Sequence, residues 1–257
     1  MPSTTRPNAG YAAELNGAAR LQPIVSQPFP YADGDFRLTG ELHRPADLGD
    51  GRGVLVVHEA DGIGGNVRRR CAMLAQLGYV ALAADLYGVG KPLEGDEMRT
   101  AMDGLRADSE RFRRRIGAGV DALATVADPE RLVAIGYCFG GLAVLELARS
   151  GAQVRAVASF HGLLTTKAPA GPGAIRAKVA AYTGAKDPLV PPEDIAAFHA
   201  EMMTADADWQ LAVYGQALHS FTNIGVKDSP DPRMDYDPEA DAASWADALR
   251  FLEMALA

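Results

Sequence analysis

Cys138 stands in a segment that could present a reactive thiol. The segment is LVAIGYCFGG (Leu132–Gly141), in which an apolar run passes through G-x-C-x-G-G into a helical pattern. A nucleophile on a sharp strand-to-helix turn has a strained backbone, and small neighbours let the strand and the helix approach each other. The positive end of the helix dipole there also favours a thiolate. We therefore predict a nucleophile at Cys138 rather than the small buried residue that a free cysteine commonly is.

A thiol nucleophile needs a base and an acid, and candidates for both follow in the chain. Asp187 lies in a polar turn after the apolar run 178–182, and His219 follows the run Trp209–Tyr214. This order of nucleophile, acid and base is the one found in α/β-hydrolases. We predict that Asp187 orients His219 and that His219 moves the proton of the thiol.

Other residues compete for these roles. Asp187 could be only a turn residue before Pro188, and Asp194 is a nearby rival for the role of the acid, although it has a better claim to helix capping. His199 lies in the middle of a helical pattern and His43 on a half-exposed strand, so we expect surface or packing roles for both. His161 ends a buried strand before the acid, and we expect it to line the pocket. Cys71 has helical spacing without a turn motif, which favours a structural role.

Alternating short apolar runs and amphipathic stretches indicate the elements that position these side chains. Residues 36–43 alternate apolar and polar side chains, as an antiparallel edge strand does. Continuous apolar runs predict strands buried on both faces at 53–57, 79–84, 132–135, 154–160 and 179–182, with a last strand at 209–214. Helical patterns cover 66–77, a long stretch within 96–126, 140–150, 192–204 and 238–257. The prediction is an α/β fold with a mostly parallel central sheet, helices on both faces and an antiparallel N-terminal edge.

Residues 25–257 are predicted to form a single domain. Residues 1–24 are predicted to be a tail, weakly ordered or folded into a short docking helix. The segment Ser229–Glu239 is rich in proline and acidic residues, so we expect an irregular loop that could form a wall of the site.

Composition excludes several classes of function. The 257 residues include 25 Lys and Arg and 33 Asp and Glu, giving a net charge of −8, which does not favour nucleic acid or anionic membranes as partners. The two cysteines cannot form a disulfide framework and lie in no zinc-ligand pattern. No apolar stretch is long enough for a signal peptide or a membrane span. We expect a cytoplasmic protein with a small-molecule partner.

Five short motifs together resemble the dienelactone hydrolase (carboxymethylenebutenolidase) family of the α/β-hydrolase superfamily. The similarity extends from about Phe36 to the C-terminus. The motifs are GYCFGG (Gly136–Gly141), VVHE (Val56–Glu59), DLY (Asp85–Tyr87), Asp187-Pro188 and HSF (His219–Phe221).

The resemblance implies a fourth catalytic residue, Glu59, which in that family lies near the sulfur and helps to set its protonation state. Glu59 also follows a predicted strand at the end where open α/β sheets bind ligands, although it could be a solvated loop carboxylate. The backbone N–H groups of Ala60 and Phe139 are the predicted oxyanion hole. The glycines of Gly62–Gly65 lack the spacing and the lysine of a nucleotide-binding loop.

Expected substrate-binding residues are Tyr87, His161, Phe221 and Asn223. The family has an arginine shortly after the catalytic histidine that holds the substrate carboxylate, whereas this chain has Asn223. Arg99, Arg106 or Arg233 could supply that charge instead.

The sequence thus predicts a cysteine-dependent hydrolase of a small lactone or ester that forms a thioester acyl-enzyme. It is expected to need no metal or organic cofactor and to act as a monomer or homodimer. A carboxylesterase or thioesterase of broader specificity is the alternative, favoured by the loss of the arginine. A non-catalytic binding module of the same fold is a third reading, which the intact Cys, Asp and His set disfavours.

Overall fold

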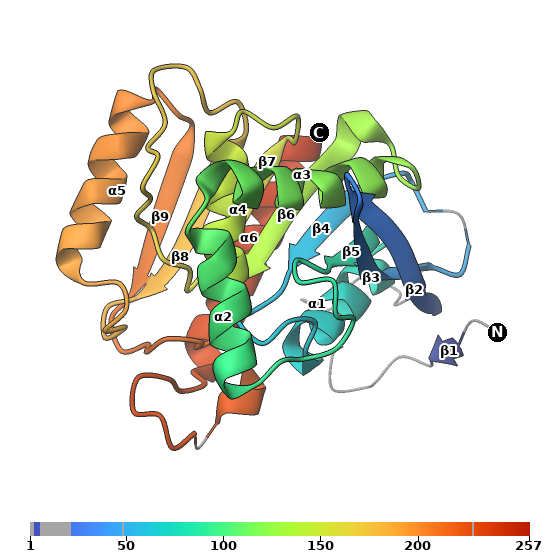
Figure 1. Ribbon diagram of the computed structural model, residues 1–257, viewed down its shortest axis with the longest axis horizontal. Coiled ribbons are helices and arrows are strands. Elements are labelled where there is room, and N and C mark those ends of the chain that lie inside the picture. Colours follow the sequence, from blue (N-terminus) through green and yellow to red (C-terminus); the bar gives the residue numbers. More distant parts are fainter. Residues whose placement is uncertain (1–2, 6–21, 48, 228) are drawn as a thin grey trace.

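The chain forms one twisted sheet with helices on both faces (Figure 1). The computed structural model describes residues 3–5, 22–47, 49–227 and 229–257. Over these residues the sheet has nine strands in the order β1-β2-β3-β5-β4-β6-β7-β8-β9. The predicted α/β class, with a mostly parallel sheet and an antiparallel N-terminal edge, is confirmed. Most of the predicted N-terminal tail lies outside the described residues.

The strands are β1 (Ser3–Thr5), β2 (Ile24–Asp33), β3 (Phe36–Pro45), β4 (Gly53–Val57), β5 (Val80–Ala84), β6 (Leu132–Tyr137), β7 (Ala156–Phe160), β8 (Lys178–Gly184) and β9 (Trp209–Tyr214). The helices are α1 (Gly65–Gln76), α2 (Gly95–Arg106), α3 (Ser109–Ala124), α4 (Phe139–Arg149), α5 (Pro192–Thr204) and α6 (Pro238–Leu256), with short 3-10 turns at Pro129–Arg131 and Ile224–Val226. Among the described residues, no helix has the length and apolar character needed to cross a membrane.

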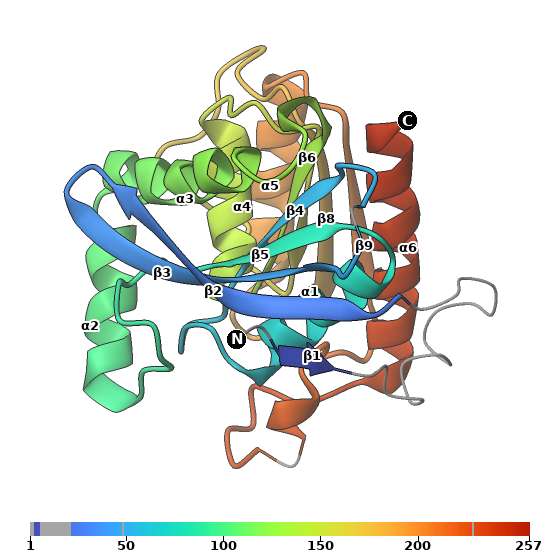
Figure 2. The same ribbon diagram turned by 90° about the vertical axis from the view of Figure 1, so that its right-hand side faces the viewer.

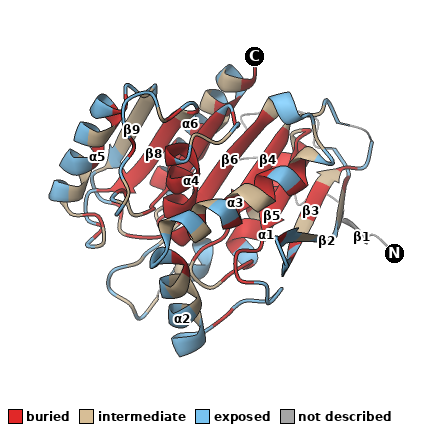
Figure 3. Ribbon diagram, turned by 45° about the horizontal axis from the view of Figure 1, so that its top comes forward, coloured by how far each residue is buried: buried red, intermediate tan, exposed pale blue. Residues whose placement is uncertain are grey.

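Two apolar cores lie on opposite faces of the sheet. Along β4, Leu55 and Val57 pack into one core and Val54 and Val56 into the other, because successive side chains of a strand point to opposite faces. The first core includes residues of α3, α4 and α5, and the second includes residues of α1 and α6. Figure 2 shows α3 and α6 on opposite sides of the strands, and Figure 3 shows the central strands buried.

The N-terminal edge differs from the prediction. β3 is antiparallel as expected, but it lies between β2 and β5 and is therefore not an edge strand. β2 was not predicted, because Pro28 and Pro30 interrupt its pattern. Proline cannot donate a backbone hydrogen bond and is tolerated at the outside of a sheet. β1 pairs only with residues 24–26, so both prolines lie where β2 itself is outermost.

The long helical stretch predicted within 96–126 is two helices. The carboxylate of Asp108 accepts a hydrogen bond from the backbone N–H of Arg111 and caps the start of α3. A side-chain cap of this kind satisfies an N–H group that the first turn of a helix leaves free. The chain can therefore end α2 and begin α3 within three residues.

Two glycines allow the tight turn between β6 and α4. A Cβ on Gly136 would lie 2.0 Å from the carbonyl oxygen of Gly140, and a Cβ on Gly140 would lie 2.2 Å from the carbonyl oxygen of Val57. Backbone atoms occupy both places, so no side-chain rearrangement could make room. The G-x-C-x-G pattern is thus a steric requirement of this turn.

We expect Gly140→Ala to lower the free energy of unfolding by about 1–3 kcal/mol, because an added methyl forces strand and helix apart. Gly117→Ala, in α3 where nothing lies within 4 Å of an added Cβ, is the matched control. It should raise the free energy of unfolding by about 0.5–1 kcal/mol. Urea denaturation measures both changes, and similar small effects at the two positions would contradict the steric argument.

Candidate active site

The carboxyl ends of β4, β6 and β8 meet at the lower edge of the sheet in Figure 1, and the loops that follow them carry the predicted site. Cys138 follows β6 directly and is the residue before the first turn of α4. Its φ of 53° and ψ of −114° lie in a strained region for a residue with a side chain. The thiol is partly exposed, whereas Cys71 is fully buried in α1.

Cys138, His219 and Asp187 form a continuous chain of contacts. His219 Nε2 lies 3.1 Å from Cys138 Sγ, and His219 Nδ1 lies 2.7 Å from Asp187 Oδ2. The second carboxylate oxygen of Asp187 accepts a hydrogen bond from the backbone N–H of Leu189 at 2.8 Å. His219 and Asp187 are both buried. The three residues come from segments far apart in the sequence, and the fold brings them to one point.

The charges around His219 favour its protonated form. Burial alone would lower the pKa of His219, but the Cys138 thiolate and the hydrogen-bonded Asp187 carboxylate outweigh it and raise this pKa to about 10. An imidazolium that faces the sulfur stabilises a thiolate, which is the nucleophilic form of cysteine. The geometry therefore supports an ion pair between Cys138 and His219.

The acidic, proline-rich segment predicted as a wall of the site holds the backbone of His219. The backbone N–H of His219 donates to the carbonyl of Arg233 at 3.0 Å, and the N–H of Asp235 donates to the carbonyl of His219 at 3.2 Å. These bonds form a short bridge between His219 and Met234. The position of the base thus depends on this segment as well as on β9.

Glu59 is buried just after β4, and two asparagines hold its carboxyl group. Asn223 Nδ2 donates to one oxygen at 2.8 Å, and Asn66 Nδ2 donates to the other at 3.4 Å. Burial and the nearby Asp61 raise the pKa of Glu59 to about 7, although the two amides and His219 act in the opposite direction. Glu59 therefore titrates near neutral pH within electrostatic reach of His219.

The two residues predicted for the oxyanion hole come from the turn of Cys138 and from the loop after β4. Phe139 is the first residue of α4, and N–H groups in a first helical turn have no acceptor within the helix. Ala60 follows Glu59, and its carbonyl accepts a hydrogen bond from the Tyr87 hydroxyl at 3.0 Å. Tyr87 also stacks against Phe139 with ring centroids 6.0 Å apart. Tyr87, in the loop after β5, therefore contacts both residues that carry the predicted donors.

The other predicted pocket residues have different surroundings. Phe221 is fully buried and packs against Tyr214 and His161. Asn223 contacts Glu59, as described above. His161 is also fully buried, and both of its ring nitrogens form contacts within the protein. Phe221 and His161 therefore support the site from the protein interior.

The remaining histidines lie outside this chain of contacts. His199 on α5 packs against Trp209. His58 is buried, with Nδ1 2.6 Å from the carbonyl oxygen of Glu59. His43 lies between Ser26 and Glu41, at 2.9 Å from each.

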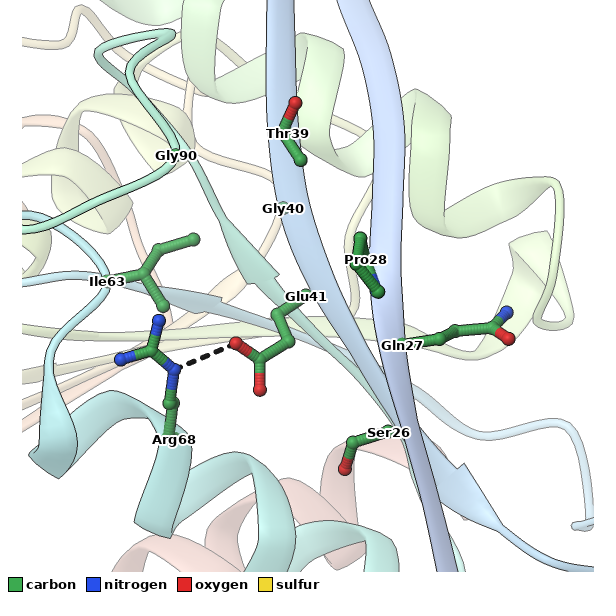
Figure 4. Close-up of a pocket in the computed structure, with 9 residues that line it drawn as sticks. All are labelled: Ser26, Gln27, Pro28, Thr39, Gly40, Glu41, Ile63, Arg68 and Gly90. Atoms are coloured by element: carbon green, nitrogen blue, oxygen red, sulfur yellow. Dashed lines mark hydrogen bonds and ion pairs between the residues drawn. The ribbon is translucent and has the colours of Figure 1, made fainter. Parts of the chain in front are cut away.

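A cavity of about 210 Å³ lies beside β2, β3 and α1, and its lining includes Ser26, Glu41, Ile63 and Arg68 (Figure 4). No residue of the Cys138 site lines it. Arg68 donates to Glu41 there at 2.8 Å, so these two charges neutralise each other.

Within the part of the chain that the structure describes, no cluster of three or more His, Cys, Asp or Glu side chains could hold a metal ion.

Asn66 and Thr222 belong to the site but were not predicted. Asn66 follows the glycines after β4 at the start of α1, and Thr222 lies between the predicted residues Phe221 and Asn223. In the sequence, the signal that could have identified them was their position beside residues that were predicted. Their partners, Glu59 and His161, could be identified only from the structure.

Known proteins resemble this chain in sequence and in structure. The model of the dienelactone hydrolase family matches residues 38–256. An Escherichia coli (strain K12) protein named "Putative carboxymethylenebutenolidase" is 30% identical over 218 residues, which are 78% of this chain and 74% of that protein. A dienelactone hydrolase-like promiscuous phosphotriesterase from metagenomic libraries is 34% identical, with a TM-score of 0.84 over 91% of this chain and 99% of that one. A chain named m3DLH is 38% identical, with a TM-score of 0.85 over the same shares.

The raised pKa of Glu59 predicts a stability that falls as the pH rises. Between its ordinary pKa of 4.5 and about 7, the folded protein keeps a proton that the unfolded chain has lost. Folding therefore becomes less favourable across this interval, by up to about 3 kcal/mol above it. Glu59→Gln should be more stable relative to wild type at pH 8 than at pH 5.

Urea denaturation at the two pH values tests this prediction. The quantity compared is the stability difference between wild type and Glu59→Gln, measured at each pH. A hydrogen bond that glutamine loses at both pH values contributes equally to both differences and does not affect the comparison. Glu97→Gln, at an exposed position of α2, controls for the removal of one negative charge. A wild-type-to-Glu59→Gln difference that is the same at pH 5 and pH 8 would rule out the shifted titration.

Proposed function

This chain belongs to the dienelactone hydrolase family, and we propose that it hydrolyses a small ester or lactone through a thioester formed on Cys138. The observation that carries the proposal is the unbroken line of contacts from Cys138 Sγ through His219 to Asp187, at 3.1 and 2.7 Å. Cys138, at the end of this line, is partly exposed and can meet a small molecule. We expect the enzyme to act as a monomer or homodimer.

The first step is attack by the Cys138 thiolate on the substrate carbonyl carbon. The oxygen becomes negatively charged, and the backbone N–H groups of Phe139 and Ala60 are the proposed donors to it. As the C–O bond breaks, His219 gives its Nε2 proton to the leaving alkoxide. In a lactone the leaving alkoxide remains attached to the acyl group. The products of this step are a thioester and a neutral His219.

Water completes the cycle. Neutral His219 accepts a proton from water at Nε2 while the water oxygen attacks the thioester carbon. The C–S bond then breaks, the carboxylic acid leaves, and the thiolate and imidazolium pair is restored. Asp187 keeps Nδ1 protonated in both steps, so that Nε2 always faces the reacting atoms.

Glu59 is proposed to adjust the protonation of the thiol through the charge balance of the site. Its pKa near 7 and its electrostatic interaction with His219 support this role. The Asn223 and Asn66 amides orient the carboxyl group. A change in its ionisation would change the field at His219 and hence at the sulfur.

The electrostatics favour neutral substrates over carboxylated ones, which supports the broader esterase or thioesterase as the second candidate. Asn223 carries no charge and uses its amide N–H to hold Glu59. Two of the cations that could replace an arginine, Arg99 and Arg233, are paired with Asp96 and Asp231. A substrate carboxylate would meet the acidic pair of Glu59 and Asp61 instead.

A non-catalytic binding module has less support. A binding site gains nothing from a thiolate and imidazolium pair with a buried orienting carboxylate, because desolvation of charged groups is unfavourable. Retention of all three groups at hydrogen-bonding distance fits covalent catalysis better.

A single turnover with p-nitrophenyl acetate tests the nucleophile. We expect an acid-quenched mixture to contain an acetyl group on the Cys138 peptide, identified by mass spectrometry. Cys138→Ala should lose this label and about 10⁴-fold or more in kcat/KM, since nucleophile and base act as a unit. Cys71→Ser is the matched control, because that thiol is fully buried, and it should keep both the label and the activity.

An acetyl group on another residue of the wild type, or turnover that survives in Cys138→Ala, would disprove the thioester mechanism. Loss of activity in Cys71→Ser with unchanged folding would also contradict it.

A panel of charged and neutral substrates tests specificity. We expect p-nitrophenyl butyrate to exceed the anionic p-nitrophenyl hemisuccinate in kcat/KM by about tenfold or more, because like charges placed together cost several kcal/mol. The cis and trans dienelactones and their methyl esters extend the comparison to lactones. A preference for the carboxylated member of each pair would place the enzyme with carboxylated-lactone hydrolases.

A further inference from the structure

Unusual backbone conformations gather around the site. Four residues other than glycine have positive φ in the described part of the chain: Cys138, His161, Asp206 and Ser220. Three of them belong to the nucleophile turn, the strand end beside it and the loop of His219. Each such residue costs roughly 1–3 kcal/mol and persists only where its surroundings hold it. The contacts of His161, with φ of 41°, show what holds these three together.

His161 bonds to the backbone of the nucleophile. The backbone N–H of Cys138 points to His161 Nδ1 at 3.1 Å and is shared with the carbonyl oxygen of Phe160 at 3.0 Å. The N–H of His161 in turn donates to the carbonyl of Tyr182 at 2.8 Å, which fixes its own backbone. His161 is therefore anchored to β8 through its backbone and to the turn of Cys138 through its ring.

The opposite side of the same ring reaches the loop of the base. His161 Nε2 lies 2.9 Å from Thr222 Oγ1, three residues beyond His219. Side chains of Arg69 and Arg70 donate to the carbonyl of Thr222 at 3.1 and 3.2 Å, so this loop is also held from α1. The rings of His161 and His219 meet edge to face with centroids 5.4 Å apart. His161 thus contacts the backbone of Cys138 and the ring of His219.

These contacts determine the tautomer of His161. A backbone N–H can only donate, so Nδ1 must carry the lone pair and Nε2 the hydrogen, which it donates to Thr222. Burial, together with the positive charges of His219 and Arg70, lowers the pKa of His161 well below its ordinary value. The ring consequently stays neutral while His219 is protonated. His219 has the opposite arrangement, with Nδ1 protonated toward Asp187.

We propose that His161 is a positioning residue that sets the Cys138 turn and the His219 loop relative to each other through its Cys138 N–H and Thr222 hydroxyl contacts. This inference rests on the proposed function of Cys138 and His219. Since misplacement of reacting groups by about 1 Å can cost about a hundredfold in rate, a fixed bridge between them affects catalysis without touching substrate.

Two pairs of variants separate positioning from simple packing. In His161→Asn, the amide oxygen can occupy the place of Nδ1 and accept from Cys138, and asparagine tolerates positive φ. In His161→Gln, the longer amide reaches Thr222 but leaves the Cys138 N–H without its second acceptor. Thr222→Val removes the hydroxyl and Thr222→Ser keeps it, at a position where φ is not positive.

Steady-state kinetics with p-nitrophenyl acetate should show kcat reduced about tenfold to a hundredfold in His161→Gln, with KM changed less than about twofold. His161→Asn should recover most of this loss. Thr222→Val should reduce kcat by about threefold or more while Thr222→Ser resembles wild type, and Thr222→Val should add nothing in the His161→Asn background. Thermal unfolding confirms that each variant is folded, and the threonine pair remains decisive if His161→Gln is not.

Equal losses in His161→Asn and His161→Gln, or an unchanged kcat in Thr222→Val, would overturn the proposal. Nitrogen-15 NMR of the wild-type imidazoles provides a test that needs no turnover. The Nε2–H tautomer of neutral His161 supports the proposal, and the Nδ1–H tautomer excludes it. A wild type that cleaves no ester but shows the Nε2–H tautomer would refute the proposed function while leaving the bridge intact.

Discussion

The close contact between β6 and α4 at Cys138 is the constraint on which the other features of the site depend. Backbone atoms approach so closely at Gly136 and Gly140 that no side chain fits at either position. This contact forces Cys138 into positive φ and presents its sulfur at the end of the sheet. The base, the acid and the proposed oxyanion donors are then arranged around a point that the strand and helix have already fixed.

Several buried groups of the site share one electrostatic environment. Cys138 and Asp187 favour a charged His219, whereas burial and Asp61 disfavour ionisation of the Glu59 carboxyl group. Burial and the positive charges of His219 and Arg70 keep His161 neutral. A site with this arrangement can hold one ion pair securely and change charge at Glu59 near neutral pH. That combination is more useful for moving protons than for retaining an anionic ligand.

Much of this arrangement could be predicted from local sequence. The glycine pattern located the turn of Cys138, and the apolar runs before Asp187 and His219 located the strand ends that bring all three together. β2 was missed because Pro28 obscured its strand pattern, and the break before α3 was missed because helical periodicity continues across Asp108.

Contacts between distant segments could not be predicted in the same way. The bond between His161 and Thr222 joins residues 61 positions apart, and the bond between Glu59 and Asn223 joins residues 164 apart. No local pattern specifies such pairs, because they depend on how the loops pack after the sheet has formed. The sequence indicated that His161 and Asn223 lie near the site but assigned both to substrate contact.

The steric origin of the turn has a consequence for how this scaffold can diversify. Since Gly136 and Gly140 determine the backbone path, the turn does not depend on the chemical identity of the Cys138 side chain, which is partly exposed. Selection can therefore exchange the reacting atom, sulfur for oxygen, without redesigning the surrounding architecture. Adaptation to a new reaction would then act mainly on the neighbours that adjust protonation, such as Glu59 and Asn223. In this fold, the backbone turn and the reacting group that it presents can thus evolve separately.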